Sequence, residues 1–375
     1  MNSLFEKKIL TLLFSVFIAS IAAGINIIAF PAILIENNIS SFFIGITSTI
    51  EIIAGVIISL FLSKIIHRIG TLKTAIAIAL VYSVVIYYIF FYQNIYVWIA
   101  LDAICGACWL SLFIIRQSWI NIVIKENRSI IIALTSTIFC AGFIIGSFFI
   151  KEIGALNHRS LILSSTLITF SIIVLFYIRN SQPREIDSQR LAFSEIYTKS
   201  KIATISRFLL SLQVSAIIFF TIVIGKYINI SVENSGLLIS AFMASGFVDL
   251  YAGFLVKKFN RINMIKIGFI GCLISMSSAM IFYESYKILL AIYFLYGCFS
   301  ALIFIASLTI INESFDKEKL ISANASFEGI GAIGSISGAL IGGIFIELFS
   351  FYGFFLLIII TNLLAIFYNK INYSK

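Results

Sequence analysis

The sequence predicts an all-α integral membrane protein with twelve transmembrane helices in two pseudo-symmetric six-helix bundles. Three observations favour this fold class: the composition, the length of the apolar runs and the distribution of basic residues. Of the 375 residues, 61% are hydrophobic and only 11% are charged, and the mean hydropathy is +1.08. A soluble domain of this size needs a charged surface, which this composition does not supply. The chain is therefore expected to lie in a lipid bilayer.

The apolar residues fall into runs of roughly 18–25 residues, the length that spans a ~30 Å hydrocarbon core as a helix. Runs of this length indicate membrane helices rather than strands. The first run is too long for a signal peptide, and Pro31 is expected to interrupt it near its end. The expected spans lie near residues 9–35, 42–62, 74–91, 97–115, 130–150, 161–178, 207–225, 236–256, 265–282, 288–311, 323–346 and 352–368.

Lysine and arginine are distributed unevenly among the segments that join these runs. With the N-terminus inside, the inner segments carry 22 of the 26 basic residues and the outer loops carry 4. Basic loops stay on the cytoplasmic side of a membrane. The pattern predicts a multi-pass protein of the inner (cytoplasmic) membrane with both termini in the cytoplasm. The net charge of +9 is then a property of one membrane side, and no nucleic-acid partner is expected.

A polar stretch divides the chain into two parts of similar length. Residues 179–206 are expected to form a cytoplasmic linker between an N-terminal bundle, 1–178, and a C-terminal bundle, 207–375. The two parts repeat each other at an offset near 191 residues. Matching glycines are Gly45 and Gly236, Gly142 and Gly334, and Gly146 and Gly338. Weak internal symmetry of this kind is typical of secondary transporters, in which two bundles rock about a central site.

The residue content argues against several other chemistries. The five cysteines all lie in apolar runs, which favours packing roles over a disulfide framework. The only histidines, His67 and His158, lie in loops without a cluster of further metal ligands. The sequence contains no phosphate-binding loop for a nucleotide. We therefore expect no enzymatic activity, no cofactor and no metal.

Four acidic residues fall within the expected spans, where a charged side chain costs ~2.5–3.5 kcal/mol on insertion scales. Glu51 is the deepest, about 18 Å from the inner end of its run, and Asp102, Asp249 and Glu328 are shallower. Burial disfavours a charged carboxylate, so these acids are candidates for binding and releasing a proton. The alternative is a structural hydrogen bond at a helix interface.

Other residues within the runs are candidates for substrate contact or for helix packing. The cavity candidates are polar or aromatic: Asn26, Trp109, Gln213, Tyr293 and Tyr296. An aromatic residue in a membrane helix more often faces lipid or a neighbouring helix, which is the alternative for each. Small residues four apart let helices approach closely. The expected packing glycines are Gly106, Gly142, Gly146, Gly334, Gly338, Gly342 and Gly343.

The loop after the second run resembles a motif of the major facilitator superfamily, Gly-x-x-x-Asp-Arg-x-Gly-Arg-Arg. Its residues here are Ser63, Arg68, Gly70 and Lys73, and a second copy in the other half has Gly253, Lys258 and Arg261. The arginine and the second glycine of the motif match in the first copy. In the family this motif forms a cytoplasmic charge clasp, and its acid is replaced here by His67 and, in the second copy, by Lys257.

Two further segments carry the resemblance. Asp102 and Gly106 have the spacing of the family's helix-four motif, Arg-x-x-x-Gly, with an acid in place of the arginine. Asp102 is therefore a candidate for taking the proton itself or for favouring cationic substrates. The segment Gln117-Ser-Trp119-Ile-Asn121, followed by Asn127-Arg128, resembles drug-efflux-like and sugar-efflux-like (YcaD-like) members.

The resemblance implies a secondary transporter that works by alternating access, with a central cavity lined by runs one, four, seven and ten. Proton-coupled export of a small amphipathic molecule is the expected activity. Proton-coupled uptake of a metabolite is the close alternative, and a non-transporting sensor or scaffold with the same fold is the other. The expected partners are a small-molecule substrate, protons and the lipid bilayer, and the chain is expected to be monomeric.

Overall fold

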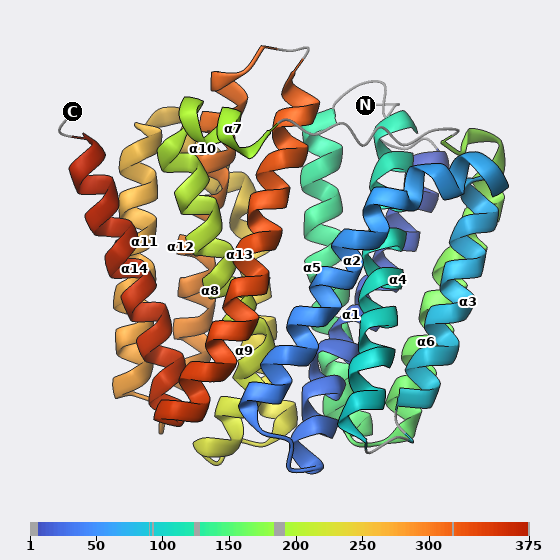
Figure 1. Cartoon of the computed structure of the whole chain (residues 1–375), viewed down its shortest axis with the longest axis horizontal. Helices are drawn as coiled ribbons and strands as arrows, with labels where there is room; N and C mark the ends of the chain where they lie inside the picture. Colours follow the sequence, from blue (N-terminus) through green and yellow to red (C-terminus); the bar gives the residue numbers. More distant parts are fainter. Residues whose placement is uncertain are drawn as a thin grey trace. The chain divides into compact units, whose positions relative to one another are not determined.

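The computed structural model describes residues 7–89, 91, 94–123, 128–183, 192–316 and 319–373 and is drawn in Figure 1. Every regular element in these ranges is a helix. Eleven of the described helices are long and apolar enough to cross a membrane, and there are up to twelve spans if the bent pair Val232–Val248 and Tyr251–Lys258 is one. The predicted all-helical membrane fold is confirmed.

The helices form two compact units. Unit 1 comprises Met1–Ile39 and Ile50–Asp187, and unit 2 comprises Ser40–Thr49 and Ser188–Lys375. The chain passes between the units three times, after Ile39, after Thr49 and after Asp187.

Unit 1 contains six helices and a 3-10 extension of the last one. They are α1 (Lys7–Glu36), α2 (Ser41–Ile69, whose residues up to Thr49 belong to unit 2), α3 (Thr71–Ile89), α4 (Ile95–Val123), α5 (Arg128–Ile153), α6 (His158–Ile173) and η2 (Val174–Ser181).

Unit 2 contains a short additional helix, α7, before its membrane helices. Its elements are α7 (Phe193–Lys199), α8 (Lys201–Tyr227), α9 (Val232–Met243), η3 (Ala244–Val248), α10 (Asp249–Lys258), α11 (Arg261–Ile281), α12 (Tyr286–Ser314), α13 (Leu320–Phe349) and α14 (Phe351–Tyr373).

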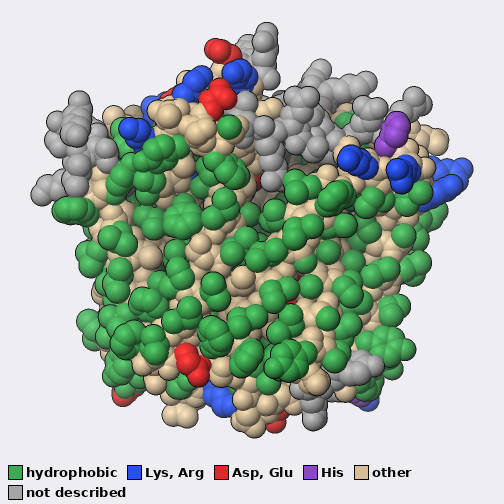
Figure 2. Space-filling model, viewed as in Figure 1, with side chains coloured by type: hydrophobic (Ala, Val, Ile, Leu, Met, Phe, Trp, Pro, Cys, Tyr) green, Lys and Arg blue, Asp and Glu red, His purple; other side chains and the backbone are tan. Residues whose placement is uncertain are grey.

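The helices α1 and α8 are the most enclosed of their units. In each, 78% of the most apolar stretch is buried, against 22% in α2. Elsewhere large apolar side chains cover the outside of the helices, and Figure 2 shows Lys and Arg gathered near the helix ends. An apolar surface of this extent fits lipid contact rather than water.

Backbone contact at glycines brings α1 onto α5 and α8 onto α13. A methyl group added at Gly142 of α5 would lie 2.6 Å from the Phe17 carbonyl oxygen of α1. One added at Gly338 of α13 would lie 2.8 Å from the Leu212 carbonyl carbon of α8. Glycine at these positions therefore sets how closely each helix pair packs. The other glycines with such contacts on these two interfaces are Gly146 and Gly334.

Three helices differ from the expected runs. α1 continues through Pro31 to Glu36, because Pro31 and its neighbours are buried and packing holds the helix across the missing backbone hydrogen bond. α4 continues past residue 115 to Val123 and so includes polar residues that the run length had excluded. The eighth expected run is broken after η3, between Val248 and Tyr251, and its two helical parts are bent by 53°.

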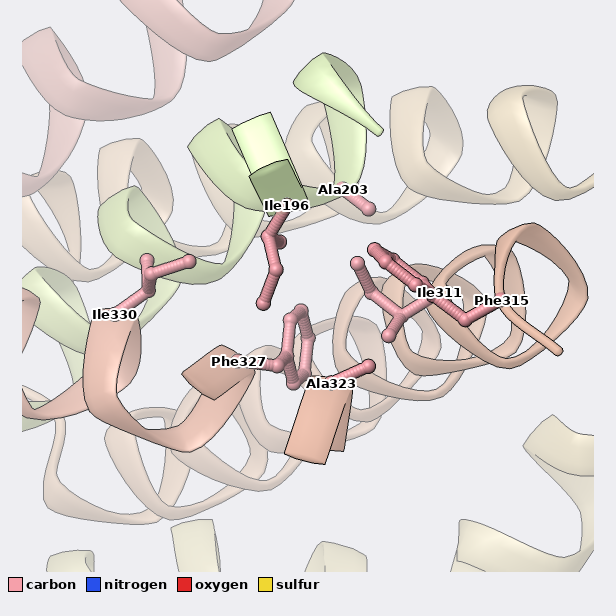
Figure 3. Close-up of a cluster of buried hydrophobic side chains, with 7 residues drawn as sticks. All are labelled: Ile196, Ala203, Ile311, Phe315, Ala323, Phe327 and Ile330. Carbon is pink, nitrogen blue, oxygen red and sulfur yellow. The ribbon is translucent and has the colours of Figure 1, made fainter. Parts of the chain in front are cut away.

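The short helix α7 is fixed to unit 2 by an apolar cluster. Figure 3 shows Ile196 of α7 pointing toward the Phe327 ring of α13. The cluster consists of Ile196, Ala203, Ile311, Phe315, Ala323, Phe327 and Ile330. An ion pair of 3.1 Å between Lys319 Nζ and Glu195 Oε1 adds a polar contact. Part of the polar stretch expected as a linker is therefore a helix packed on unit 2.

Candidate functional site

Two acidic side chains of unit 1 meet where α2 crosses α4. Gly106 of α4 faces Glu51 of α2 so closely that a methyl group on Gly106 would lie 2.6 Å from Glu51 Cγ. Asp102 lies one helical turn from Gly106 and is close enough to Glu51 for their charges to interact. Asp102 is 4% exposed, and its Oδ1 has no hydrogen-bond partner within the described part of the chain. We call these two residues the acid pair.

Polar groups from two further helices lie beside the acid pair. Asn26 of α1 donates a hydrogen bond of 3.3 Å from Nδ2 to the Tyr82 hydroxyl of α3. Both side chains are buried, and Tyr82 lies within electrostatic reach of Glu51. Asn26 Oδ1 is a buried acceptor that lacks a partner among the described residues. Four helices, α1 to α4, thus bring polar groups together in the interior of unit 1.

The chemistry open to this arrangement is proton binding. A carboxylate in an apolar interior loses hydration, and a second carboxylate nearby makes a double negative charge still less favourable. Two such acids titrate as a coupled pair and share protons between them. The acid pair can therefore take up and release a proton.

A buried arginine, Arg116 of α4, was missed by sequence reasoning. Its guanidinium donates to the Ser15 hydroxyl of α1 from Nε at 3.3 Å and to the Ser171 hydroxyl of α6 from Nη2 at 2.7 Å. Arg116 is 5% exposed and lies inside an apolar helix. Because the apolar run ends at residue 115, run length alone places this arginine in the loop that follows. Its partners Ser15 and Ser171, which are fully buried on α1 and α6, were the available signal that a polar group lies between these helices.

Unit 2 has a polar cluster of neutral groups. The Tyr296 hydroxyl of α12 donates to Gln213 Oε1 of α8 at 2.6 Å, and the Tyr293 and Thr221 hydroxyls lie 3.2 Å apart on the same two helices. These side chains are buried, and Gln213 Nε2 has no partner among the described residues. Three of the five cavity candidates, Gln213, Tyr293 and Tyr296, thus lie together between α8 and α12.

The remaining candidates lie apart from these clusters. Trp109 of α4 is partly buried, and Asp249 begins α10 at the bend after η3. Glu328 of α13 is 56% exposed and forms an ion pair with Arg207 of α8. The Arg207 guanidinium also lies over the rings of Phe304 and Phe327, at 4.9 and 5.4 Å from their centres.

The first loop motif forms the turn between α2 and α3. Gly70 has a φ of +88°, a conformation that favours glycine, and Arg68 and Lys73 are exposed. The residues after η2 contact this turn. Gln182 Oε1 accepts a hydrogen bond of 3.1 Å from the Leu72 backbone N–H, and the Thr71 hydroxyl donates to the Pro183 carbonyl oxygen. Ser63 is partly buried near the end of α2.

In the second copy of the motif, Arg261 makes an ion pair of 2.8 Å with Glu313 of α12. Lys258 Nζ lies 5.6 Å from the centre of the Phe259 ring. A methyl group added at Gly253 would meet nothing within 4 Å, so packing does not require glycine there. Of the segment that resembles efflux-like members, Trp119 is buried and donates to the Ser181 hydroxyl at 3.3 Å. Asn127 lies outside the described residues.

Two other predicted packing glycines lie on α13. A methyl group at Gly342 would lie 2.7 Å from the Phe220 ring of α8, and one at Gly343 would lie 2.8 Å from the Ser41 carbonyl oxygen. A methyl group added at Gly45 of α2 would likewise lie 2.6 Å from the Ala339 carbonyl oxygen of α13. These contacts explain why the first residues of α2 group with unit 2.

Comparison with known proteins gives a family and a fold. A family model described as Major Facilitator Superfamily matches residues 12–202 and 203–371. A mutant form of the nucleoside transporter NupG has 14% identity and a TM-score of 0.81, with 97% of this chain and 99% of that chain covered. A bacterial homologue of the human lysosomal transporter Spinster, inward-facing and occupied, has 12% identity and a TM-score of 0.73, with 98% and 96% covered. No curated protein sequence matches significantly.

Proposed function

Because the chain belongs to the major facilitator superfamily, we propose that it is a secondary active transporter that couples proton movement to the transport of a small molecule. The family supports transport, because secondary transporters of this superfamily work by alternating access. The substrate, the coupling and the direction are parts of this proposal.

The acid pair is the observation that carries the proton coupling. Asp102 of α4 is buried, and its Oδ1 has no hydrogen-bond partner among the described residues. Glu51 of α2 lies against Gly106, one turn along α4 from Asp102. Acidic side chains inside a membrane are costly and mark proton or ion pathways. We assign the pair the role of binding a proton in one access state and releasing it in the other.

The neutral cluster between α8 and α12 supports an uncharged or amphipathic substrate. Gln213 offers an amide, and Tyr293 and Tyr296 offer hydroxyl groups on aromatic rings, which suits a small molecule with both polar and apolar parts. Asn26 and Trp109 are the candidate contacts from unit 1.

We propose export across the cytoplasmic membrane, with both termini in the cytoplasm. The excess of Lys and Arg in alternate loops supports this orientation. Uptake of a metabolite is the second candidate, since one protein of similar fold is the nucleoside transporter NupG. A non-transporting sensor or scaffold is the third, because both loop motifs lack the family's acid.

The first test compares small-molecule pools in cells that express the wild type, Glu51→Gln, Glu152→Gln or no protein. Glu152 is an exposed acid at the end of α5 and serves as the matched control. We expect one solute to be depleted by the wild type and by Glu152→Gln but not by Glu51→Gln. Enrichment of that solute instead would identify uptake. Equal pools in all four strains would argue for the sensor or scaffold.

A further inference from the structure

The short helix α7 exposes two aromatic side chains at the end of a membrane helix. Phe193 and Tyr197 lie about one turn apart on α7 and are 45% and 42% exposed, whereas Ile196 is buried in the apolar cluster of unit 2. Only Ser200 separates α7 from α8, which is long and apolar enough to span a membrane. Figures 1 and 2 show α7 at the end of unit 2 where Lys and Arg side chains gather. The two rings therefore lie at the level of the membrane–water interface, where aromatic side chains are favoured.

Tyr197 also connects α7 with the lipid-facing side of unit 2. Its side chain is hydrogen-bonded to that of Tyr368 on α14. The neighbouring Phe367 is exposed, as are Leu363 and Leu364 about one turn before it. Exposed apolar side chains on a membrane helix indicate contact with acyl chains. The part of α7 that carries Tyr197 thus borders a lipid-facing part of α14.

A lysine without an ion-pair partner lies at the same place. Lys201 Nζ is 5.9 Å from the centre of the Tyr197 ring, and the side chain is exposed. The ion pairs within the described part of the chain do not include Lys201. Lys199 is directed elsewhere, because its Nζ lies 4.6 Å from the centre of the Phe315 ring at the end of α12. Lys201 therefore brings a positive charge to the hydroxyl groups of the two tyrosines.

This combination of groups matches the chemistry of a phospholipid with a negative headgroup. A phosphate accepts hydrogen bonds from ammonium and hydroxyl donors, and its charge neutralises the lysine. The acyl chains of the same molecule require an apolar surface, which the exposed side chains of α14 supply. A zwitterionic headgroup matches less well, since it carries a positive charge of its own.

We propose that Lys201, Tyr197 and Tyr368 bind the headgroup of an anionic phospholipid whose acyl chains lie along α14. The site holds α7, and with it the start of α8, at the membrane surface. The inference concerns contact between unit 2 and the bilayer and does not depend on the proposed transport.

Native mass spectrometry of the purified full chain tests the site, because it counts the lipid molecules that stay bound. The probe is dioleoyl-phosphatidylglycerol, and dioleoyl-phosphatidylcholine is the control with the same acyl chains. We expect the wild type to bind the first phosphatidylglycerol molecule more tightly than phosphatidylcholine. Lys201→Gln should weaken this binding about fivefold, the effect of one lysine at an anionic membrane surface.

Lys199→Gln is the matched control, since it removes the same charge two residues away at the Phe315 ring. We expect it to weaken phosphatidylglycerol binding by less than about twofold, because a more distant exposed charge is screened by salt. Equal weakening in the two lysine variants would overturn the proposal in favour of a diffuse attraction to the basic end of unit 2. Equal binding of the two lipids by the wild type would also overturn it, as would displacement of the lipid by inorganic phosphate.

Two further variants separate the charge from the hydroxyl groups. Lys201→Arg keeps the charge and should bind phosphatidylglycerol like the wild type, whereas Tyr197→Phe keeps the ring and should bind it more weakly, with phosphatidylcholine binding unchanged. An arginine variant that binds as weakly as Lys201→Gln would refute the role of the charge. Wild-type binding by Tyr197→Phe would refute the role of the hydroxyl. Thermal unfolding checks that each variant is folded, and if Lys201→Gln is not, Tyr197→Phe still decides.

Discussion

Substitution of Gly106 by alanine tests the geometry on which the acid pair depends. The added methyl group would lie 2.6 Å from the Glu51 carbonyl carbon and would overlap the Glu51 carbonyl oxygen, whereas ordinary contacts begin at 3.4 Å. The α2 backbone must therefore move by at least about 0.8 Å from α4. Because the carbonyl carbon and oxygen of Glu51 belong to the α2 backbone, a side-chain rotation does not remove the overlap.

Overpacking of this kind costs about 1–3 kcal/mol. We expect Gly106→Ala to lower the temperature of thermal unfolding in detergent and to weaken solute movement, because Glu51 is displaced from Asp102. Gly253→Ala is the matched control, since its methyl group would meet nothing within 4 Å. Alanine is favoured over glycine in a helix by up to ~1 kcal/mol, so this control should be neutral or stabilising.

Thermal unfolding of the two purified variants, followed side by side, decides the matter. A Gly106→Ala protein as stable as Gly253→Ala would show that α2 and α4 are not in backbone contact at this position. The contact between Gly106 and Glu51 would then no longer support a short distance between Glu51 and Asp102.

Four other substitutions have expected outcomes in the same unfolding assay. Arg207→Ala should destabilise unit 2 by about 1–3 kcal/mol, because the arginine also stacks on two phenylalanine rings. Glu328→Ala should cost less than about 1 kcal/mol, because the acid is exposed. Equal losses of stability in the two variants would contradict this reasoning. Tyr296→Phe removes the 2.6 Å bond to Gln213 and should cost about 1–3 kcal/mol, and a neutral result would mean that water replaces the hydroxyl. Gly70→Ala should cost about 1–2 kcal/mol through its φ of +88° alone, and stabilisation would show that the turn relaxes.

The helical membrane fold was predictable because run length and composition report directly on the bilayer. The same reasoning was less accurate at helix ends, where hydropathy does not mark the boundary. α4 continues through Arg116 to Val123 because the arginine finds hydroxyl partners on α1 and α6, which are distant in sequence. The bend between α9 and α10 likewise leaves no sign in an uninterrupted apolar run.

The candidate site was predictable only as a set of separate residues. Glu51 and Asp102 were singled out because acids are rare in membrane helices, but uniformly apolar runs do not fix helix rotation, so their closeness needed the structure. Tyr82 gave no signal among 16 tyrosines. Glu328 resembles the other acids in sequence, and its exposure and its ion pair with Arg207 set it apart in the structure.

The most direct test of the central claim is solute flux into liposomes that contain the purified protein, driven by a pH gradient alone. The solute is the one identified from the cellular pools, and wild type is compared with Glu51→Gln and Glu152→Gln. We predict that the pH gradient drives accumulation by the wild type and by Glu152→Gln, and that Glu51→Gln does not respond to the gradient. Gradient-driven accumulation by Glu51→Gln at the wild-type level would remove the acid pair from the mechanism.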